Sequence, residues 1–324
     1  MIKTAICFNE KGKKVMQRLN EAFLEAGIEP AAVYDLSEKS GDMPLSDIAA
    51  AEFEAGHPLI FVGALGIAVR AVSGCIKDKL RDVAVVVIDD NMRFVIPVLS
   101  GHAGGANKLA ATIAQLLGAI PVITTSTDIN DAFSADVFAA ENRLTIRNRE
   151  GIKKVAVKAL EGKPVTLSIK DYPPAEPVDI IVADEADEEC SLLLSPKPYI
   201  IGVGARKGTD VGKLEEYIMS TIQSLDITID EIYALATIDI KENEPAIKEF
   251  STKYRIPIVS FEASVLKRVA GDFTGSEFVE QTVGVDNVCE RTALLAAGPG
   301  GIVILRKHAC DGMTIAISKK GTVY

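Results

Sequence analysis

An apolar run, a glycine-rich turn and an amphipathic helix follow one another in Val95–Ala110, and this succession constrains the fold most. The helix carries apolar side chains at i, i+4, i+7 and i+8, namely Leu109, Ile113, Leu116 and Leu117. A strand that passes through such a turn into a helix directs unpaired backbone N–H groups to one point, which favours an anion. We therefore expect a ligand-binding turn, with substrate contacts from Ser100, Gly101, Gly104, Gly105 and Asn107.

His102 stands in the middle of this turn and is one of three histidines in the chain. Its ordinary pKa lies near neutrality, so the imidazole can accept or donate a proton at cellular pH. The turn lacks the Gly-Lys-Ser/Thr ending of a P-loop and the glycine spacing of a dinucleotide-binding turn. A surface histidine in a tight strand-to-helix connection is the structural alternative. We predict that the turn forms one wall of an active site and that His102 is catalytic.

Strand and helix patterns alternate at the start of the chain. Ile2–Phe8 is a short apolar run, and Lys11–Ala26 has an apolar helical face, a succession typical of an α/β domain. Val83–Ile88 and Arg93–Val98 are apolar runs separated by four residues, which predicts a hairpin or a tight strand pair.

The length of 324 residues suits two or three domains. We predict an α/β fold with a Rossmann-like N-terminal α/β domain over residues 1–140 and a C-terminal α/β domain over residues 197–324. A small α/β segment over residues 141–196, without glycine turns or histidines, would connect them.

Two further turns in the first domain carry candidate ligand contacts. Gly63 and Gly66 follow a strand pattern, with Arg70 on the next helix, and a later strand leads into Thr124–Asp128. Turns after parallel strands gather at the carboxyl edge of a sheet, where ligands bind, and an arginine there can hold a carboxylate bidentately. A solvated helix arginine and hydroxyl capping are the alternatives. The candidates are Gly63, Gly66, Arg70, Thr124, Thr125 and Asp128.

The C-terminal domain offers two candidate features. The strand-like Tyr199–Val203 leads into a glycine-basic turn, where Gly202, Gly204 and Arg206 would cradle a carboxylate. Glu290 is a candidate general acid, although a Glu–Arg step in the first turn of a helix is usually a solvated ion pair.

The composition excludes several classes of function. A net charge of −10 and a pI near 5.0 argue against nucleic acid as a generic partner. Five scattered cysteines without a CxxC pair indicate a reducing compartment. The first residues already form a strand pattern, which leaves no place for a signal peptide, and no apolar run is long enough for a membrane span. We expect a cytoplasmic protein. A histidine metal site would need His57, His102 and His308 from three separate regions, so we expect none.

The order of these segments resembles the family of cobalt-precorrin-5A hydrolases of the anaerobic cobalamin pathway. The resemblance runs nearly the whole length, and the glycine–histidine turn followed by a Val-Cys-Glu segment is its specific combination. The matching segments are Gly63–Arg70, Ile96–Ala110, Pro121–Asp128, Ile200–Thr209, Val283–Gly298 and Thr314–Ser318. Family members often have a cysteine where this chain has Ala205, so no catalytic thiol is available there.

The resemblance implies that a lactone on the ring-contracted macrocycle is opened by water and that a two-carbon fragment leaves as acetaldehyde, giving cobalt-precorrin-5B. The cobalt belongs to the substrate, so no cofactor is expected. His102 is our candidate base, and the N–H groups around Gly104 and Gly105 are candidate oxyanion donors. With Arg70 and Gly202–Lys207, this turn would bind a flat, carboxylate-bearing ligand between two closing domains.

Two other functions stay open at this point. A non-catalytic carrier of a tetrapyrrole from the same pathway would bind the ligand and release no acetaldehyde. A nucleotide-dependent enzyme would be stabilised by ATP or NAD, but the phosphate-binding patterns are missing. Other corrin-pathway enzymes and a second copy of the chain, as a homodimer, are candidate partners beside the substrate.

Overall fold

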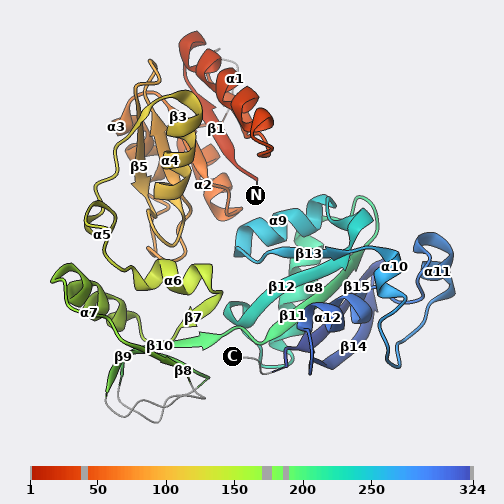
Figure 1. Cartoon of the computed structure of the whole chain (residues 1–324). Coiled ribbons are helices and arrows are strands. Elements are labelled where there is room, and N and C mark those ends of the chain that lie inside the picture. Colours follow the sequence, from red (N-terminus) through yellow and green to blue (C-terminus); the bar gives the residue numbers. More distant parts are fainter. Residues whose placement is uncertain (1, 38–42, 170–176, 185–189, 322–324) are drawn as a thin grey trace. The chain divides into compact units, whose positions relative to one another are not determined.

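The computed structural model describes residues 2–37, 43–169, 177–184 and 190–321. The chain divides into two compact units (Figure 1). The first unit comprises Met1–Glu141 and Asn148–Val165, and the second comprises Asn142–Arg147 and Thr166–Tyr324.

A six-stranded sheet in the order β2-β1-β3-β4-β5-β6 forms the centre of the first unit. Strands β1 to β4 are parallel, β5 runs antiparallel to β4, and β6 is parallel to β5. The strands are β1 (Thr4–Cys7), β2 (Ala32–Asp35), β3 (Leu59–Val62), β4 (Val85–Ile88), β5 (Phe94–Leu99) and β6 (Ile120–Pro121). The predicted pairing of Val83–Ile88 with Arg93–Val98 is confirmed as an antiparallel pair.

Helices cover both faces of this sheet because successive strand residues point to opposite sides. The helices of the first unit are α1 (Glu10–Glu25), α2 (Leu45–Glu54), α3 (Leu65–Val72), α4 (Ala106–Leu117), α5 (Ser126–Ile129), α6 (Ala135–Glu141) and α7 (Arg149–Leu160). Helices α1 and α4 pack on the face that presents Ile60 and Val62, whereas α2 and α3 pack on the face that presents Leu59 and Phe61.

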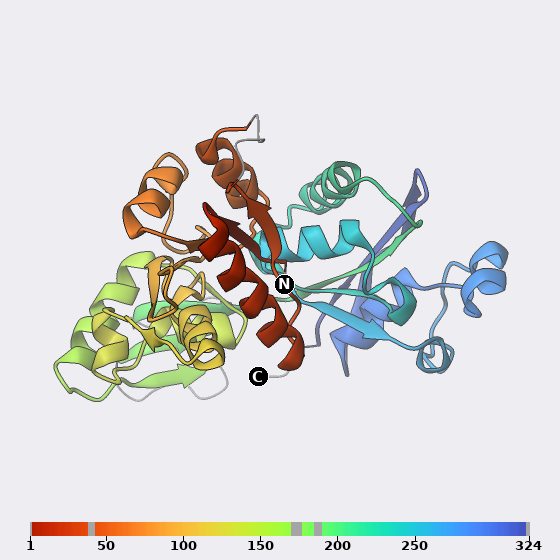
Figure 2. The same cartoon turned by 90° about the horizontal axis from the view of Figure 1, so that it is seen from above.

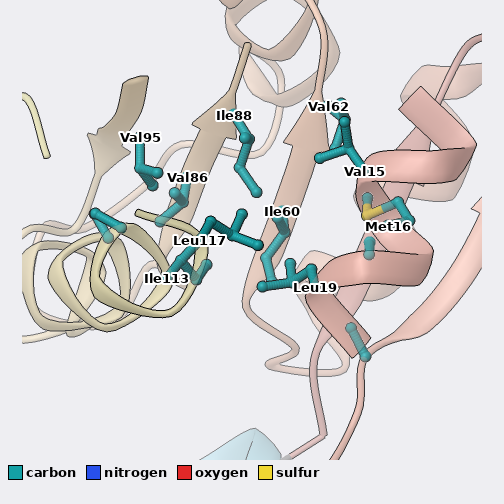
Figure 3. Packing of buried hydrophobic residues seen from close by; sticks show 14 of the residues in the cluster. Val15, Met16, Leu19, Ile60, Val62, Val86, Ile88, Val95, Ile113 and Leu117 are labelled. Carbon is teal, nitrogen blue, oxygen red and sulfur yellow. The ribbon is translucent and has the colours of Figure 1, made fainter. Parts of the chain in front are cut away.

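The core beneath α1 and α4 is built from side chains at helical spacing (Figure 3). Met16 and Leu19 of α1 and Ile113 and Leu117 of α4 lie against strand residues such as Ile60. These side chains are at most 8% exposed, and burying an aliphatic side chain of this size contributes about 1.5 to 3 kcal/mol. The apolar face therefore fixes α4, and with it the turn that precedes it, against the sheet.

The second unit contains a five-stranded sheet in the order β13-β12-β11-β15-β14. Strands β11, β12 and β13 are parallel, and β15 lies antiparallel between β11 and β14. Helices α8 and α9 lie side by side on one face, and α12 covers the other (Figure 1, Figure 2). The elements are β11 (Tyr199–Ala205), α8 (Val211–Gln223), β12 (Ile232–Ile238), α9 (Pro245–Tyr254), β13 (Ile258–Phe261), α10 (Ala263–Leu266), α11 (Glu277–Val283), α12 (Cys289–Ala297), β14 (Ile302–Cys310) and β15 (Met313–Lys319), with short 3-10 turns at Ile229–Glu231 and Asp239–Lys241.

A smaller sheet in the order β7-β10-β9-β8 completes the second unit. Its strands are β7 (Leu144–Ile146), β8 (Leu167–Ile169), β9 (Val178–Val182) and β10 (Cys190–Pro196). The predicted α/β class is confirmed, since strands and helices alternate through both units. The division at residues 140 and 196 stays a prediction.

One local expectation about β11 is wrong. The strand was expected to end at Val203 and pass into a glycine-rich turn, but it continues to Ala205, so Gly202 and Gly204 lie inside the sheet. A Cβ on Gly202 would lie 1.8 Å from the carbonyl oxygen of Cys289. Glycine is needed there because α12 begins directly against the strand.

Candidate functional site

Strand direction decides which of the predicted turns meet. Leu99, the last residue of β5, pairs with Val85, the first residue of β4. The turn around His102 therefore lies at the edge where the parallel strands begin. Gly63 follows Val62, the last residue of β3, and so lies at the opposite edge. The expectation that these two turns share one edge is wrong, because β5 reverses the direction of the chain.

The segment Thr124–Asp128 reaches the same edge as His102. Strand β6 runs parallel to β5, and the Val122 N–H donates to the Val95 carbonyl oxygen just beyond it. Asp128 Oδ2 then receives hydrogen bonds from His102 Nε2 at 2.8 Å and from Asn107 Nδ2 at 2.9 Å. Asn107 Nδ2 also lies 3.0 Å from Thr125 Oγ1. Four of the predicted site residues are thus brought together in one cluster.

The other nitrogen of His102 faces residues that the sequence did not single out. His102 Nδ1 lies 3.4 Å from Asp136 Oδ1 and 3.3 Å from Ser134 Oγ. Ser134 Oγ donates in turn to Asp136 Oδ1, and Thr127 Oγ1 lies 3.1 Å from His102 Nε2. Both imidazole nitrogens are therefore engaged. We call His102, Asn107, Asp128, Ser134 and Asp136 the histidine cluster.

The two carboxylates control the charge of His102. The hydrogen bond to Asp136, supported by that to Asp128, outweighs partial burial and raises the pKa of His102 to about 9. Burial acts to raise the pKa of Asp136, but hydrogen bonds from His102 and Ser134 lower it to about 2. At neutral pH His102 is an imidazolium and Asp136 a carboxylate, which is the opposite of the protonation state that a histidine base needs.

Three N–H groups at the end of the glycine turn donate to carbonyl oxygens within the turn. Gly105 N donates to the His102 carbonyl, Ala106 N to the Ser100 carbonyl and Asn107 N to the Gly101 carbonyl. These donors cap the start of α4, so they are not directed at a ligand as the sequence led us to expect. Among the described residues, no hydrogen-bond partner is found for the Gly104 N–H, which remains a candidate oxyanion donor.

Glycines are required in this turn by its own packing. A Cβ on Gly104 would lie 2.3 Å from Ser100 Cβ, and one on Gly101 would lie 2.7 Å from Asn107 Oδ1. Ser100 has a φ of 55°, and its buried Oγ has no hydrogen-bond partner among the described residues. The turn is therefore shaped to hold Asn107 at the start of α4.

At the opposite edge, Gly63 has a φ of 146°, and a Cβ there would meet the Phe8 ring at 3.2 Å. Arg70 is exposed, with its guanidinium folded over Gly66. It makes no ion pair within the described part of the chain. The structure therefore separates Gly63, Gly66 and Arg70 from the histidine cluster.

In the second unit, Glu290 is 1% exposed. Its Oε1 accepts the Lys307 N–H at 2.7 Å, and its Oε2 accepts the Thr274 N–H at 3.2 Å. Arg291 pairs instead with Asp286, so the alternative of a solvated Glu–Arg pair is wrong, and the role of Glu290 as a general acid stays a prediction. Glu290 ties two backbone segments to α12, which is a structural role.

Arg206 and Gly204 occupy structural positions too. The Arg206 side chain lies against Gly312, since a Cβ there would meet Arg206 Cδ at 2.6 Å. A Cβ on Gly204 would lie 2.5 Å from Thr314 Oγ1. The predicted carboxylate cradle therefore does not have the open glycine turn that was expected.

Among the residues that the structure describes, no group of three or more His, Cys, Asp or Glu side chains is placed to hold a metal ion. In the same residues, no helix has the length and apolar character needed to cross a membrane.

Comparisons with known proteins connect both units to one family. Models of the families Cobalamin synthesis G N-terminal and Cobalamin synthesis G C-terminus match residues 47–128 and 199–318. The chain is 32% identical to a cobalt-precorrin-5A hydrolase of Priestia megaterium, over 82% of this chain and 79% of that protein. It is 31% identical to a cobalt-precorrin-5A hydrolase of Salmonella typhimurium, over 73% of this chain and 75% of that protein.

Among solved structures, a cobalamin biosynthesis protein G homolog from Sulfolobus solfataricus is 23% identical, with a TM-score of 0.43. The alignment covers 98% of this chain and 96% of that one. Within the histidine cluster, His102, Asn107 and Asp128 fall in the matched range 47–128, whereas Ser134 and Asp136 lie beyond it.

Proposed function

Because the chain belongs to the cobalamin synthesis G family, we infer that it is a cobalt-precorrin-5A hydrolase. Two relatives that align with most of its length carry that name. The substrate is a cobalt-containing tetrapyrrole, and its cobalt is part of the molecule that reacts. We propose that the protein uses no cofactor of its own.

The proposed reaction consumes one water molecule. Water adds to the carbonyl carbon of the lactone, and the ring C–O bond breaks to leave a carboxyl group and a hydroxyl-bearing two-carbon fragment. The C–C bond that joins this fragment to the macrocycle then breaks. Its electron pair and the hydroxyl proton pass to the macrocycle, and the fragment leaves as acetaldehyde. Such a step needs a group that accepts a proton from water and a group that stabilises negative charge on the lactone oxygen.

The histidine cluster is the observation that supports a reaction site at this sheet edge. It combines an imidazolium that is 15% exposed with a carboxylate, Asp128, that is 37% exposed. An exposed carboxylate held by an imidazolium thus lies at the sheet edge, in the same unit as the turn with the unpaired Gly104 N–H. These are the elements that acid–base opening of an ester-like bond requires.

A basic concavity in the same unit supports binding of a polycarboxylate. It has a volume of about 500 Å³ and lies on α7, which contacts α5 and α6. These two short helices carry Asp128 and Asp136. Lysine ammonium groups attract carboxylates, and we propose that they hold acidic side chains of the macrocycle. The concavity is lined by Lys153, Lys154, Val157, Lys158, Glu161 and Lys163.

The deciding experiment measures acetaldehyde released from anaerobically prepared cobalt-precorrin-5A, with the macrocycle absorbance followed in the same tube. Catalytic release supports the hydrolase. Stoichiometric binding without acetaldehyde would support a tetrapyrrole carrier instead. Neither binding nor release would contradict the proposed substrate.

A further inference from the structure

The two oxygens of the Asp128 carboxylate have different surroundings. Oδ2 accepts hydrogen bonds from His102 and Asn107. Oδ1 has no hydrogen-bond partner among the described residues, and the side chain is 37% exposed. Asp128 therefore combines one oxygen fixed by two donors with one oxygen that is available to a ligand or to water.

His102 has the reverse arrangement. Its side chain is 15% exposed, and carboxylates face both of its nitrogens, Asp128 on Nε2 and Asp136 on Nδ1. A general base needs an unshared lone pair within hydrogen-bond reach of the proton that it removes. An imidazolium between two carboxylates has no such lone pair.

We propose that Asp128 is the general base of lactone opening and that His102 and Asn107 are positioning residues that fix its Oδ2. This proposal rests on the proposed function. Asp128 Oδ1 takes a proton from water while the water oxygen forms its bond to the lactone carbonyl carbon. The ring C–O bond then breaks, and the departing alkoxide receives the proton from Asp128. The carboxylate is regenerated, and one water has been consumed.

Asp136 does not fit the role of base. Its side chain is 11% exposed, and its Oδ1 also accepts from Ser134 and from the Val137 N–H. It faces His102 from α6, on the side away from Asp128, and fixes the orientation of the ring. The cluster is thus a chain of contacts, Asp136 to His102 to Asp128, in which Asp128 is the more exposed carboxylate.

The kinetic test compares Asp128→Asn with His102→Gln, using acetaldehyde release and an absorbance titration of substrate binding. An amide at 128 can still accept from His102 but cannot take a proton, so kcat should fall about 10²- to 10⁴-fold with Kd little changed. The acidic limb of the pH–rate profile should vanish in this variant. His102→Gln keeps a donor near Oδ2, so it should lower kcat less and keep that limb.

Asp47→Asn, an exposed aspartate in the first turn of α2, is the matched control and should behave as wild type. If Asp128→Asn keeps wild-type kcat, or if only His102→Gln removes the acidic limb, the assignment of the base is overturned. A wild-type protein that releases no acetaldehyde would overturn the proposed function itself.

A measurement without substrate tests the same arrangement. The 15N chemical shifts of the His102 ring should show both nitrogens protonated at pH 7 in the wild-type protein. The ring should lose its proton at lower pH in Asp128→Asn. A neutral ring in the wild-type protein at pH 7 would contradict the proposal, because His102 would then have a free lone pair.

Discussion

Asp128 Oδ2 lies 2.8 Å from His102 Nε2, although 26 residues separate the two in the sequence. The contact forms because β5 and β6 run side by side in the same direction and deliver their following turns to one sheet edge. A substitution at either residue should therefore change the hydrogen bonding of the other, and the change can be measured there.

The stability of the first unit should depend on pH through His102. Its folded-state pKa of about 9 exceeds the ordinary 6.5 because Asp136 and Asp128 stabilise the imidazolium. The resulting stability is complete below pH 6.5 and is lost as pH rises through 9. The difference between these two pKa values, at about 1.4 kcal/mol per pKa unit, corresponds to about 3.5 kcal/mol, which solvent screening of the partly exposed ring reduces to about 2 to 3 kcal/mol. Urea unfolding from pH 6 to 9.5 measures it against His102→Gln. If the free energy of unfolding changes with pH in the same way in both proteins, the prediction is contradicted.

Replacing Glu290 should affect stability rather than chemistry. Glu290→Gln removes charge-assisted acceptance of two backbone N–H groups at a site that is 1% exposed, at a cost of about 1 to 3 kcal/mol. Thermal unfolding should show a lower Tm, and the folded fraction should keep its rate of acetaldehyde release. Glu216→Gln, at an exposed position on α8, is the control. A lost rate of acetaldehyde release with an unchanged Tm would support the prediction that Glu290 is catalytic.

Substitution at Gly202 should strongly lower the free energy of unfolding. A Cβ there meets the Cys289 backbone at 1.8 Å, so Gly202→Ala must displace α12 from β11, at a cost of about 3 kcal/mol. Denaturant unfolding measures the loss. Gly74→Ala, where a Cβ meets nothing within 4 Å, should change stability by no more than about 0.5 kcal/mol. Equal stability of the two variants would show that α12 is not seated on Gly202.

Arg70 should prove dispensable for the reaction. It lies at the sheet edge opposite the histidine cluster, so Arg70→Gln should leave kcat and KM within about twofold of wild type. Steady-state acetaldehyde release provides both parameters. A large fall in kcat would mean that the carboxyl edge of β3 takes part in catalysis.

The lysines of α7 should act on binding. Lys153→Gln combined with Lys154→Gln removes two exposed charges from the basic concavity, so KM should rise several-fold while kcat stays near wild type. Added salt should reduce the difference in KM between this variant and the wild type, because salt screens exposed charges. Lys213→Gln, at an exposed position on α8, is the matched control. Identical kinetics in the wild type, the double variant and this control would contradict a role of the concavity in substrate binding.

Much of the fold could be predicted from local patterns. The apolar spacing of Leu109, Ile113 and Leu117 predicts α4, and Gly118, with a φ of 66°, ends it. Pairing of the two runs around Asp89–Met92 was also predicted correctly. That pairing already implies that the turn after Leu99 lies away from Gly63. The prediction that every turn lies at the carboxyl edge was wrong because it did not take this antiparallel pairing into account.

The site could be predicted only in part. His102, Asn107 and Asp128 stand in glycine- or hydroxyl-rich turns that mark ligand sites, and the structure brings them together. Asp136 gave no such signal, because an acidic residue in the first turn of a short helix is ordinary. The burial of Glu290 depends on Thr274 and Lys307, which are distant in sequence, so no local pattern could reveal it.

The reversal of the chain at β5 has a consequence for how this protein can vary. Every member of the histidine cluster comes after that reversal, between His102 and Asp136, while the parallel strands β1, β3 and β4 contribute none. One contiguous stretch of chain thus holds the whole cluster, and this stretch is joined to the parallel strands through the buried face of α4. A substitution in the core beneath α4 can therefore shift every group of the cluster together, although none of the parallel strands contributes a residue to it.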